Sequence, residues 1–364
     1  MVENQYFSED KKKVKKSVGD FKCGGCGANL VYDPNTHKLV CNHCGFTQNI
    51  EINTFVAERD FSELSAHKFG QDDKVKTVTC TNCGATEILK NDEIASRCPF
   101  CSSPLVVNES EIDSVKPDSL IPFMFDSKRA KEHCNNWIKS RWFAAHAFKK
   151  ELKLNNPNGI YYPIWTFDSH TMTTYQGRLG KTYTTTHTDS KGHVHTTTHV
   201  RWFNVDGTRK NYFDDIIINA SGFVEDRTIS KLMPYPQNLY TVYSNEYLAG
   251  FLANHYTVDP FTAFKTAEDR MRETIKQEII RSYNADRVDY LNMNMVHNQK
   301  SFKSMFVPIY LTGAKYKEKF YRQYINGATG KILGAYPKSI FKISLVILLI
   351  LGLIGVIAYF ALTR

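Results

Sequence analysis

The sequence lacks the compositional bias of disordered, collagen-like or long coiled-coil proteins. Of its 364 residues, 42% are hydrophobic, 13% are aromatic and 23% are charged, which is enough apolar material for a packed core. At roughly 150 residues per domain, this length predicts two or three folded units. The composition therefore predicts an ordinary globular body, and the distinctive features lie at its two ends.

Signals of secretion and of ATP hydrolysis are also missing. The first 21 residues contain a lysine run at 11–16 but no apolar stretch, which argues against a secretory signal. GRLGKT at 177–182 has two residues between its glycines where a phosphate loop needs four, and GATGK at 327–331 lacks the Ser or Thr. No Ser/His/Asp or Cys/His arrangement can be assigned. We therefore expect no enzymatic turnover, and specifically no helicase or ATPase activity.

Charged residues are absent from positions 343–362, ISLVILLILGLIGVIAYFAL. A helix of twenty residues rises about 1.5 Å per residue and so crosses a hydrocarbon core of about 30 Å. Lys331, Lys338 and Lys342 precede this segment and only Arg364 follows it among charged residues, so the positive-inside rule places the large N-terminal body in the cytoplasm. The sequence predicts a single-pass membrane protein with a C-terminal anchor.

Cysteine, by contrast, is concentrated near the N-terminus. Eight of the nine cysteines form four C-x-x-C pairs, and two such pairs supply the four thiolates of a tetrahedral zinc site. The pairs recur with a constant shift of 57 residues, which indicates a duplicated zinc ribbon and two structural zinc ions. All-cysteine sites leave no coordination position for water or substrate. The predicted zinc ligands are Cys23, Cys26, Cys41, Cys44, Cys80, Cys83, Cys98 and Cys101.

Three other roles of paired cysteines fit less well. Structural disulfides are disfavoured by the predicted cytoplasmic location, and redox chemistry by the lack of a βαβ pattern around the pairs. An iron–sulfur cluster is disfavoured by the match to two separate tetrahedral sites. We expect His43, between two ligands, to be solvated, and the ninth cysteine, Cys134, to be a small buried side chain.

Charge is unevenly distributed along the chain, whose formal net charge is +9. Residues 23–101 carry 7 Lys/Arg against 10 Asp/Glu, or −3, and two zinc ions with eight thiolates make this about −7. Such a surface repels phosphate, so nucleic-acid binding is not the favoured function. After Leu120 the count is 32 against 19, and this basic part suits an anionic membrane surface.

Two helices are predicted in the middle of the chain. One starts at Asp126 or Ser127 and carries an apolar face that runs through Trp142 to Ala145. The other opens at Asp259-Pro260, with Phe261 among its inward-facing residues. Strands between and after these helices make residues 117–338 an α+β body.

Residues 160–220 are rich in Thr, Tyr, Trp and Val and predict strands that break at Gly180, Gly192 and Gly207. Asp214 and Asp215 would point to opposite faces at an exposed strand end.

Four histidines lie in a predicted hairpin at 187–199. A four-residue loop would place His193, His195 and His199 on one face and His187 on the other. His193 and His199 would be about 20 Å apart, too far to ligate one ion without a bend. We expect a solvated hairpin, and whether it binds a metal is left open.

The predicted fold is therefore two tandem small zinc ribbons, each with four cysteine ligands, followed by an α+β body and a single C-terminal transmembrane helix. Its units are a basic flexible tail (1–20), a first zinc ribbon (21–50), a linker (51–77), a second zinc ribbon (78–108), the α+β cytoplasmic body (117–338) and the transmembrane helix (343–362).

These features together resemble a family of bacterial membrane proteins with TFIIB-type zinc ribbons. The resemblance rests on the twin ribbons, on YYPIWTFD, FDDIIINAS and VPIYLTGAKYKEKFYRQYINGATGKILG, and on the final helix, and it covers the chain from Phe21. Members are often labelled primosomal protein N′ or replication-restart helicase, and some resemble components of phage-shock or SPFH-type membrane-stress operons.

The resemblance implies a bacterial cell-membrane location and protein partners such as a phage-shock protein A homologue or a flotillin-like SPFH protein. It implies no catalytic residue. The helicase label is at odds with the missing phosphate loop. We expect a cytoplasmic protein-interaction platform in envelope stress or membrane homeostasis; the alternative is a membrane-tethered nucleic-acid factor that uses residues 11–16 and the basic body.

Overall fold

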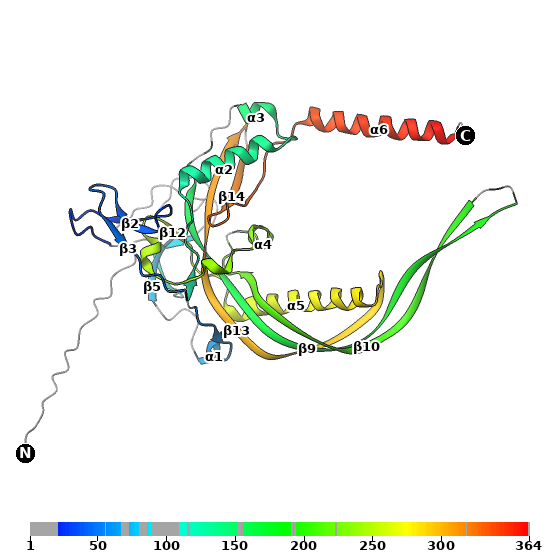
Figure 1. Ribbon diagram of the computed structural model, residues 1–364, viewed down its shortest axis with the longest axis horizontal. Coiled ribbons are helices and arrows are strands. Elements are labelled where there is room, and N and C mark those ends of the chain that lie inside the picture. Colours follow the sequence, from blue (N-terminus) through cyan, green and yellow to red (C-terminus); the bar gives the residue numbers. More distant parts are fainter. Residues whose placement is uncertain are drawn as a thin grey trace, which may run out of the picture.

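The computed structural model describes residues 21–54, 56–66, 73–79, 86–88, 109–114, 117–150, 154, 156–190, 192, 194–222, 224–317 and 319–362. Within these residues the chain forms a small N-terminal sheet, a mixed α+β body dominated by antiparallel strands, and one long C-terminal helix (Figure 1). The α+β body and the terminal helix match the sequence-based prediction. The predicted tail (1–20) and most of the second ribbon lie outside the described residues.

Three long strands build the centre of the body. They are β9 (Asn158–Thr188), β10 (Val194–Asn219) and β13 (Arg287–Tyr316). The main sheet runs in the order β10-β9-β13-β14-β15, with β14 at Lys319–Asn326 and β15 at Ile332–Gly334, and neighbours on this path are antiparallel. Four two-residue strands join it: β4 (Arg59–Asp60), β8 (Ser119–Leu120), β11 (Thr241–Val242) and β12 (Leu252–Ala253).

The long strands run through two of the three glycines at which breaks were predicted. Gly192 lies between β9 and β10, but Gly180 and Gly207 continue the strands. A Cβ on Gly180 would lie 2.8 Å from the Trp202 ring, and one on Gly207 would lie 2.7 Å from the Tyr175 hydroxyl. Glycine at these positions makes room for a cross-strand side chain and does not end a strand.

The helices are α1 (Glu63–Ala66), α2 (Ser127–Ser140), α3 (His146–Lys150), α4 (Asp226–Leu232), α5 (Pro260–Ser282) and α6 (Ile340–Leu362), with short 3₁₀ turns η1 (Gln237–Leu239) and η2 (Asn245–Leu248). The predicted caps are confirmed: Asp126 accepts a hydrogen bond from the Arg129 N–H at 2.8 Å and Asp259 accepts one from the Thr262 N–H at 3.0 Å.

Two aromatic residues assigned to buried helix faces are exposed instead. Helix α2 ends at Ser140, so Trp142 lies beyond it and is 53% exposed. Phe261 is in the first turn of α5 and is 44% exposed. Helical periodicity placed both inward, but α2 ends before Trp142, and Phe261 lies beside the buried face of α5 that begins with Pro260 and Phe264.

Apolar side chains cover both faces of β9 in the part of the sheet that lies between the α5 side and the α4 side. Tyr161, Trp165 and Phe167 belong to one buried cluster, which also takes the inner face of α5. Ile160 and Ile164 alternate with them and belong to a second cluster on the α4 side. Because strand side chains alternate in direction, β9 holds two cores at once.

Residues of the predicted 51–77 linker take part in the main sheet. Strand β4 pairs with β13 in the register Ser301↔Asp60 and Phe302↔Arg59. Phe61 packs on Phe264 of α5, with ring centroids 4.5 Å apart. This segment therefore covers one end of the aromatic core.

Two small three-stranded sheets reflect the repeat. The first contains β1 (Leu30–Asp33), β2 (Lys38–Cys41) and β3 (Thr47–Asn49), and the second contains β5 (Asp73–Thr79), β6 (Thr86–Ile88) and β7 (Glu109–Ser114). The backbone bridge Lys22↔Asn29 recurs as the pair Thr79↔Thr86, 57 residues later. The sequence repeat is thus also a repeat of strand pairing at this point.

Candidate metal centre

The first ribbon holds its cysteine pairs on two similar turns. The Gly27 N–H donates to the Cys23 carbonyl at 2.9 Å, and the Gly45 N–H donates to the Cys41 carbonyl at 2.9 Å. Both glycines have a positive φ, +74° and +76°, a conformation that costs glycine little and other residues more. Glycine after the second cysteine therefore lets each turn close.

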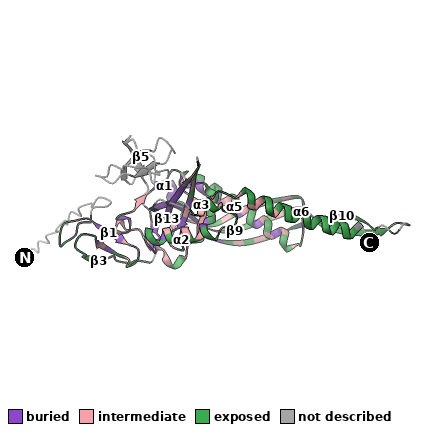
Figure 2. Ribbon diagram, turned by 90° about the horizontal axis from the view of Figure 1, so that it is seen from above, coloured by how far each residue is buried: buried purple, intermediate pink, exposed green. Residues whose placement is uncertain are grey.

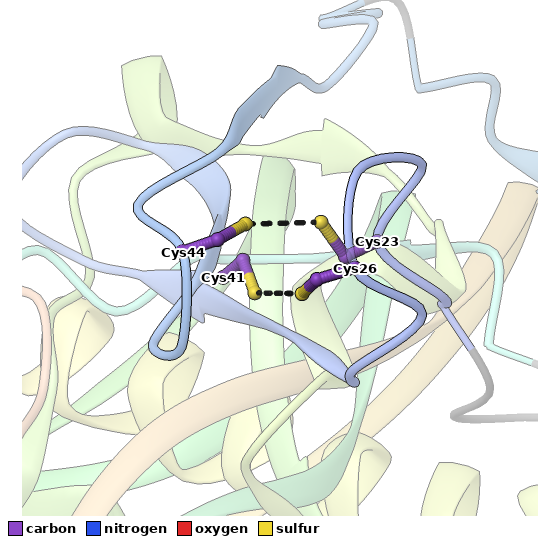
Figure 3. Close-up of side chains that lie close together, drawn as sticks. All are labelled: Cys23, Cys26, Cys41 and Cys44. Atoms are coloured by element: carbon purple, nitrogen blue, oxygen red, sulfur yellow. Dashed lines mark hydrogen bonds between the residues drawn. The ribbon is translucent and has the colours of Figure 1, made fainter.

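Cys23, Cys26, Cys41 and Cys44 converge, as predicted (Figure 3). Their Sγ atoms all lie within 4.8 Å of one another, and the pairs Cys23–Cys44 and Cys26–Cys41 are 3.5 Å apart. A disulfide needs about 2.05 Å, whereas a tetrahedron with metal–sulfur bonds of about 2.3 Å has edges of about 3.8 Å. The cluster could hold one metal ion, and four thiolates in this arrangement suit zinc.

Hydrogen bonds to the sulfur atoms lower the pKa of some thiols of the cluster and raise the pKa of others. The Cys44 N–H, which points at the Cys41 sulfur, is the main cause that lowers the pKa of Cys41 to about 6. The Ala28 N–H lowers the pKa of Cys26, but hydrogen bonds with neighbouring thiols outweigh it and raise that pKa to about 12. Adjacent thiolates repel, so the cluster keeps some protons until a cation binds and displaces them.

The ribbon is docked on the body through Tyr32 of β1, which is buried. Its N–H donates to the Ala249 carbonyl at 2.9 Å and its hydroxyl donates to the Phe123 carbonyl at 3.1 Å. Its ring packs edge-to-face on Tyr247 with centroids 5.2 Å apart. Tyr32 belongs to a strand of the ribbon, so an interaction that stabilises the fold of the ribbon also stabilises this interface with the body.

The remaining predictions about cysteine have different outcomes. Cys80, Cys83, Cys98 and Cys101 lie outside the described residues, so a second metal site stays a prediction. His43 is exposed and does not belong to the cluster. Cys134 is fully buried on α2, and burial raises its pKa to about 12, which confirms it as a small apolar side chain.

A second group of metal-ligating side chains contains Asp214, which the sequence analysis placed at an exposed strand end, with Glu58 and Asp168, which it did not single out. Carboxylate oxygens of Glu58, Asp168 and Asp214 lie within 4.8 Å of one another. The Lys303 ammonium lies 3.0 Å from Asp215 and 3.4 Å from Glu58, and its side chain is only 7% exposed. A buried ammonium requires paired negative charge, which Asp215 and Glu58 supply to Lys303.

A bulge in β10 builds this group. The pairing register with β9 shifts between Phe213 and Ile216, and Asp215 has a φ of +50°. The Gln237 amide donates to Asp214 at 3.2 Å and to Asp215 at 3.1 Å. The prediction that these two acids point apart at a strand end was therefore wrong, because the bulge interrupts the alternation.

The histidine hairpin forms, with a different register from the predicted one. His187 pairs with His195 across the hairpin, so these two side chains lie on the same face. Five residues separate β9 from β10, one more than the four predicted, and a shift of one residue moves His187 to the opposite face from the predicted one. His195 is hydrogen-bonded to Asp189 at 3.3 Å and His199 to Thr185 at 2.9 Å. Within the described residues, these histidines do not join a group of three metal-ligating side chains.

Comparison with known proteins finds similarity along most of the chain. An uncharacterized protein of Bacillus subtilis (strain 168), YdjG, is 25% identical over 330 residues, which is 89% of this chain and 92% of that protein. No family model matches, and no solved structure matches. The chain is thus similar to a distant bacterial protein over nearly its whole length.

Proposed function

We propose that α6 anchors the protein in a bacterial cell membrane and that the ribbon and the α+β body form a cytoplasmic platform for protein partners. The observation that carries this proposal is the helix itself. Within Ile340–Ala361 an 18-residue stretch has a mean hydropathy of 2.9, and none of that stretch is buried inside the protein. Figure 2 shows α6 mostly exposed. An exposed apolar helix of this length is unfavourable in water and favourable in a bilayer.

The metal cluster supports a structural role within this platform. Four cysteine ligands leave no open coordination position, and the ribbon contributes Tyr32 to its interface with the body. A zinc ion there would stabilise the ribbon and, through Tyr32, its docking. We expect no turnover and no helicase activity.

The partners follow from the family resemblance. A phage-shock protein A homologue or a flotillin-like SPFH protein would link the platform to membrane stress. The distant relative in Bacillus subtilis supports a bacterial setting.

The anchor is tested by removing residues 340–364. The full chain should sediment with membranes and resist extraction at alkaline pH, whereas the truncated chain should appear in the soluble fraction. Replacement of α6 by an unrelated apolar helix of equal length is the matched control and should restore membrane retention. A truncated chain that stays with the membrane would refute α6 as the anchor.

The platform is tested by native capture of the full chain in mild detergent, with and without nuclease. Protein partners that survive nuclease and do not bring down nucleic acid are the expected result. Nucleic acid enriched by salt-sensitive binding, with partners lost after nuclease, would replace the platform by a membrane-tethered nucleic-acid factor.

A further inference from the structure

The turn between α2 and α3 lies at the base of α6 (Figure 1), and two of its aromatic side chains are exposed. Trp142 is 53% exposed and Phe143 is 37% exposed, and their rings pack edge-to-face with centroids 4.8 Å apart. Ile340 and Phe341, in the first turn of α6, are 81% and 78% exposed. These four exposed apolar residues flank the hydrogen-bonded contact between the turn and the start of α6, and we call them the collar.

Hydrogen bonds fix the collar to the start of α6. The Ser339 N–H donates to the Phe143 carbonyl at 2.8 Å, and the Lys342 ammonium donates to the Trp142 carbonyl at 2.7 Å. Ala144 and Lys338 form a backbone bridge. These bonds fix the position of Trp142 along the axis of α6, next to the first turn of that helix.

The collar is surrounded by positive charge. Segments 133–150 and 332–362 contain six Lys or Arg residues and no Asp or Glu. The Lys342 ammonium lies 5.5 Å from the centroid of the Trp142 ring. Burial and then the charge of Lys342 lower the pKa of Lys149, so two ammonium groups lie close enough to repel. The basic side chains are Lys139, Arg141, Lys149, Lys150, Lys338 and Lys342.

We propose that the collar is a second membrane contact, with Trp142 and Phe143 seated at the lipid–water interface and the lysines around them bound to the phosphates of an anionic leaflet. This inference rests on the proposed role of α6 as the anchor. Tryptophan is favoured at this depth because its ring is apolar and its N–H is polar. Lysines beside such a ring gain from the negative surface potential of the leaflet.

We infer that the collar contacts the bilayer and not a protein, because it is bonded directly to the start of the proposed membrane helix α6. A helix that enters a leaflet at Ile340 brings the residues bonded to its first turn to the same interface. The ammonium groups of Lys149 and Lys342 match lipid phosphates, and they would repel a basic protein surface.

The test uses the full chain in vesicles whose lipids carry bromine on their acyl chains, which quenches nearby tryptophan. Tryptophan emission should be quenched in the wild type, and Trp142→Phe should lose this quenching. Trp165→Phe, which removes a buried tryptophan on β9, is the control and should keep it. Equal quenching of wild type and Trp142→Phe would overturn the inference.

A second comparison tests the lysines. Quenching should be stronger in vesicles containing phosphatidylglycerol than in pure phosphatidylcholine, and the double variant Lys149→Gln/Lys150→Gln, which keeps the hydrogen bond between Lys342 and Trp142, should lose this difference. Lys210→Gln, on the exposed surface of β10, should retain it. A double variant that keeps the full lipid dependence would refute the phosphate contacts.

Flotation of the same vesicles separates the two proposals. If no variant floats, the anchor itself fails. If every variant floats but Trp142 is not quenched, only the collar fails. Equal circular dichroism of all variants would show that the substitutions leave the fold intact.

Discussion

Cys23 and Cys41 are buried while Cys26 and Cys44 are exposed, yet all four are needed for a tetrahedral set. We expect Cys23→Ser to lower the zinc content by about one ion per chain, because three thiolates leave the site incomplete. Mass spectrometry of the metal in purified protein measures this. Cys134→Ala removes a thiol outside the cluster and should keep the full content. Unchanged zinc in Cys23→Ser would show that this cluster is not the site.

Asp168 couples stability to pH. Burial, opposed in part by the Asp215 N–H and reinforced by Glu58, raises the pKa of Asp168 to about 7. The folded protein then holds a proton that the unfolded chain releases above about pH 4. This contribution to the free energy of unfolding is complete below about pH 4 and is lost as the pH rises to about 7.

Asp168→Asn isolates that contribution, since an amide keeps the hydrogen-bond acceptor for the Asp215 N–H but does not titrate. The wild type should lose stability relative to Asp168→Asn as the pH rises from about 4 to about 7, as measured by urea unfolding at several pH values. Parallel pH profiles for the two proteins would contradict a raised pKa.

At the scale of elements, the long strands β9, β10 and β13 form an arm that has three strands at its base and two at its tip. Strand β13 begins at Arg287, opposite Gly180, so residues 181–188 of β9 and 194–201 of β10 continue as a two-stranded hairpin. Such a hairpin is marginally stable by itself, whereas the base of the arm is packed on both faces.

We therefore expect amide hydrogens of 181–188 to exchange with solvent faster than those of 160–167 in the same strand. Hydrogen–deuterium exchange read by mass spectrometry compares the two segments within one molecule. Equal protection would mean that the tip is stabilised by a contact that the isolated chain does not show.

The direction of this arm also matters for membrane binding. Figures 1 and 2 both show the arm extending from the body on the same side as α6. The tip is rich in Thr and His, which are unfavourable in hydrocarbon. We expect the two-stranded tip to bend along the leaflet when α6 is inserted, because it is the part of the arm with the weakest support.

At the scale of the molecule, the ribbon and the body share an interface at Tyr32. Structural zinc contributes on the order of 10 kcal/mol to small zinc domains, more than a ribbon of this size gains from its own core. Chelation should therefore unfold the first ribbon and uncover the surface around Tyr32, while the main sheet persists.

Limited proteolysis and circular dichroism measure this together. New cleavage within 21–50 should accompany metal loss, with most of the β signal retained, and returning zinc should restore protection. Global unfolding on chelation would show that the body also depends on the metal. No change at all would show that the ribbon needs no ion.

Features that depend on neighbours along the chain could be predicted from the sequence alone. C-x-x-C spacing predicted the four clustered cysteines of the first ribbon, apolar composition predicted the exposed terminal helix, and Asp126 and Asp259 predicted two helix starts. These signals are local, because a turn, a cap or a membrane-length helix is encoded within a few consecutive turns of chain.

The remaining features became visible only once the chain was folded. Lys303 meets Glu58 across 245 positions, and Lys342 meets Trp142 across 200, so no spacing in the sequence predicted either contact. Long strands pass through Gly180 because a side chain of the neighbouring strand needs the space. Such outcomes depend on which surfaces meet after folding, and a local pattern carries no information about distant partners.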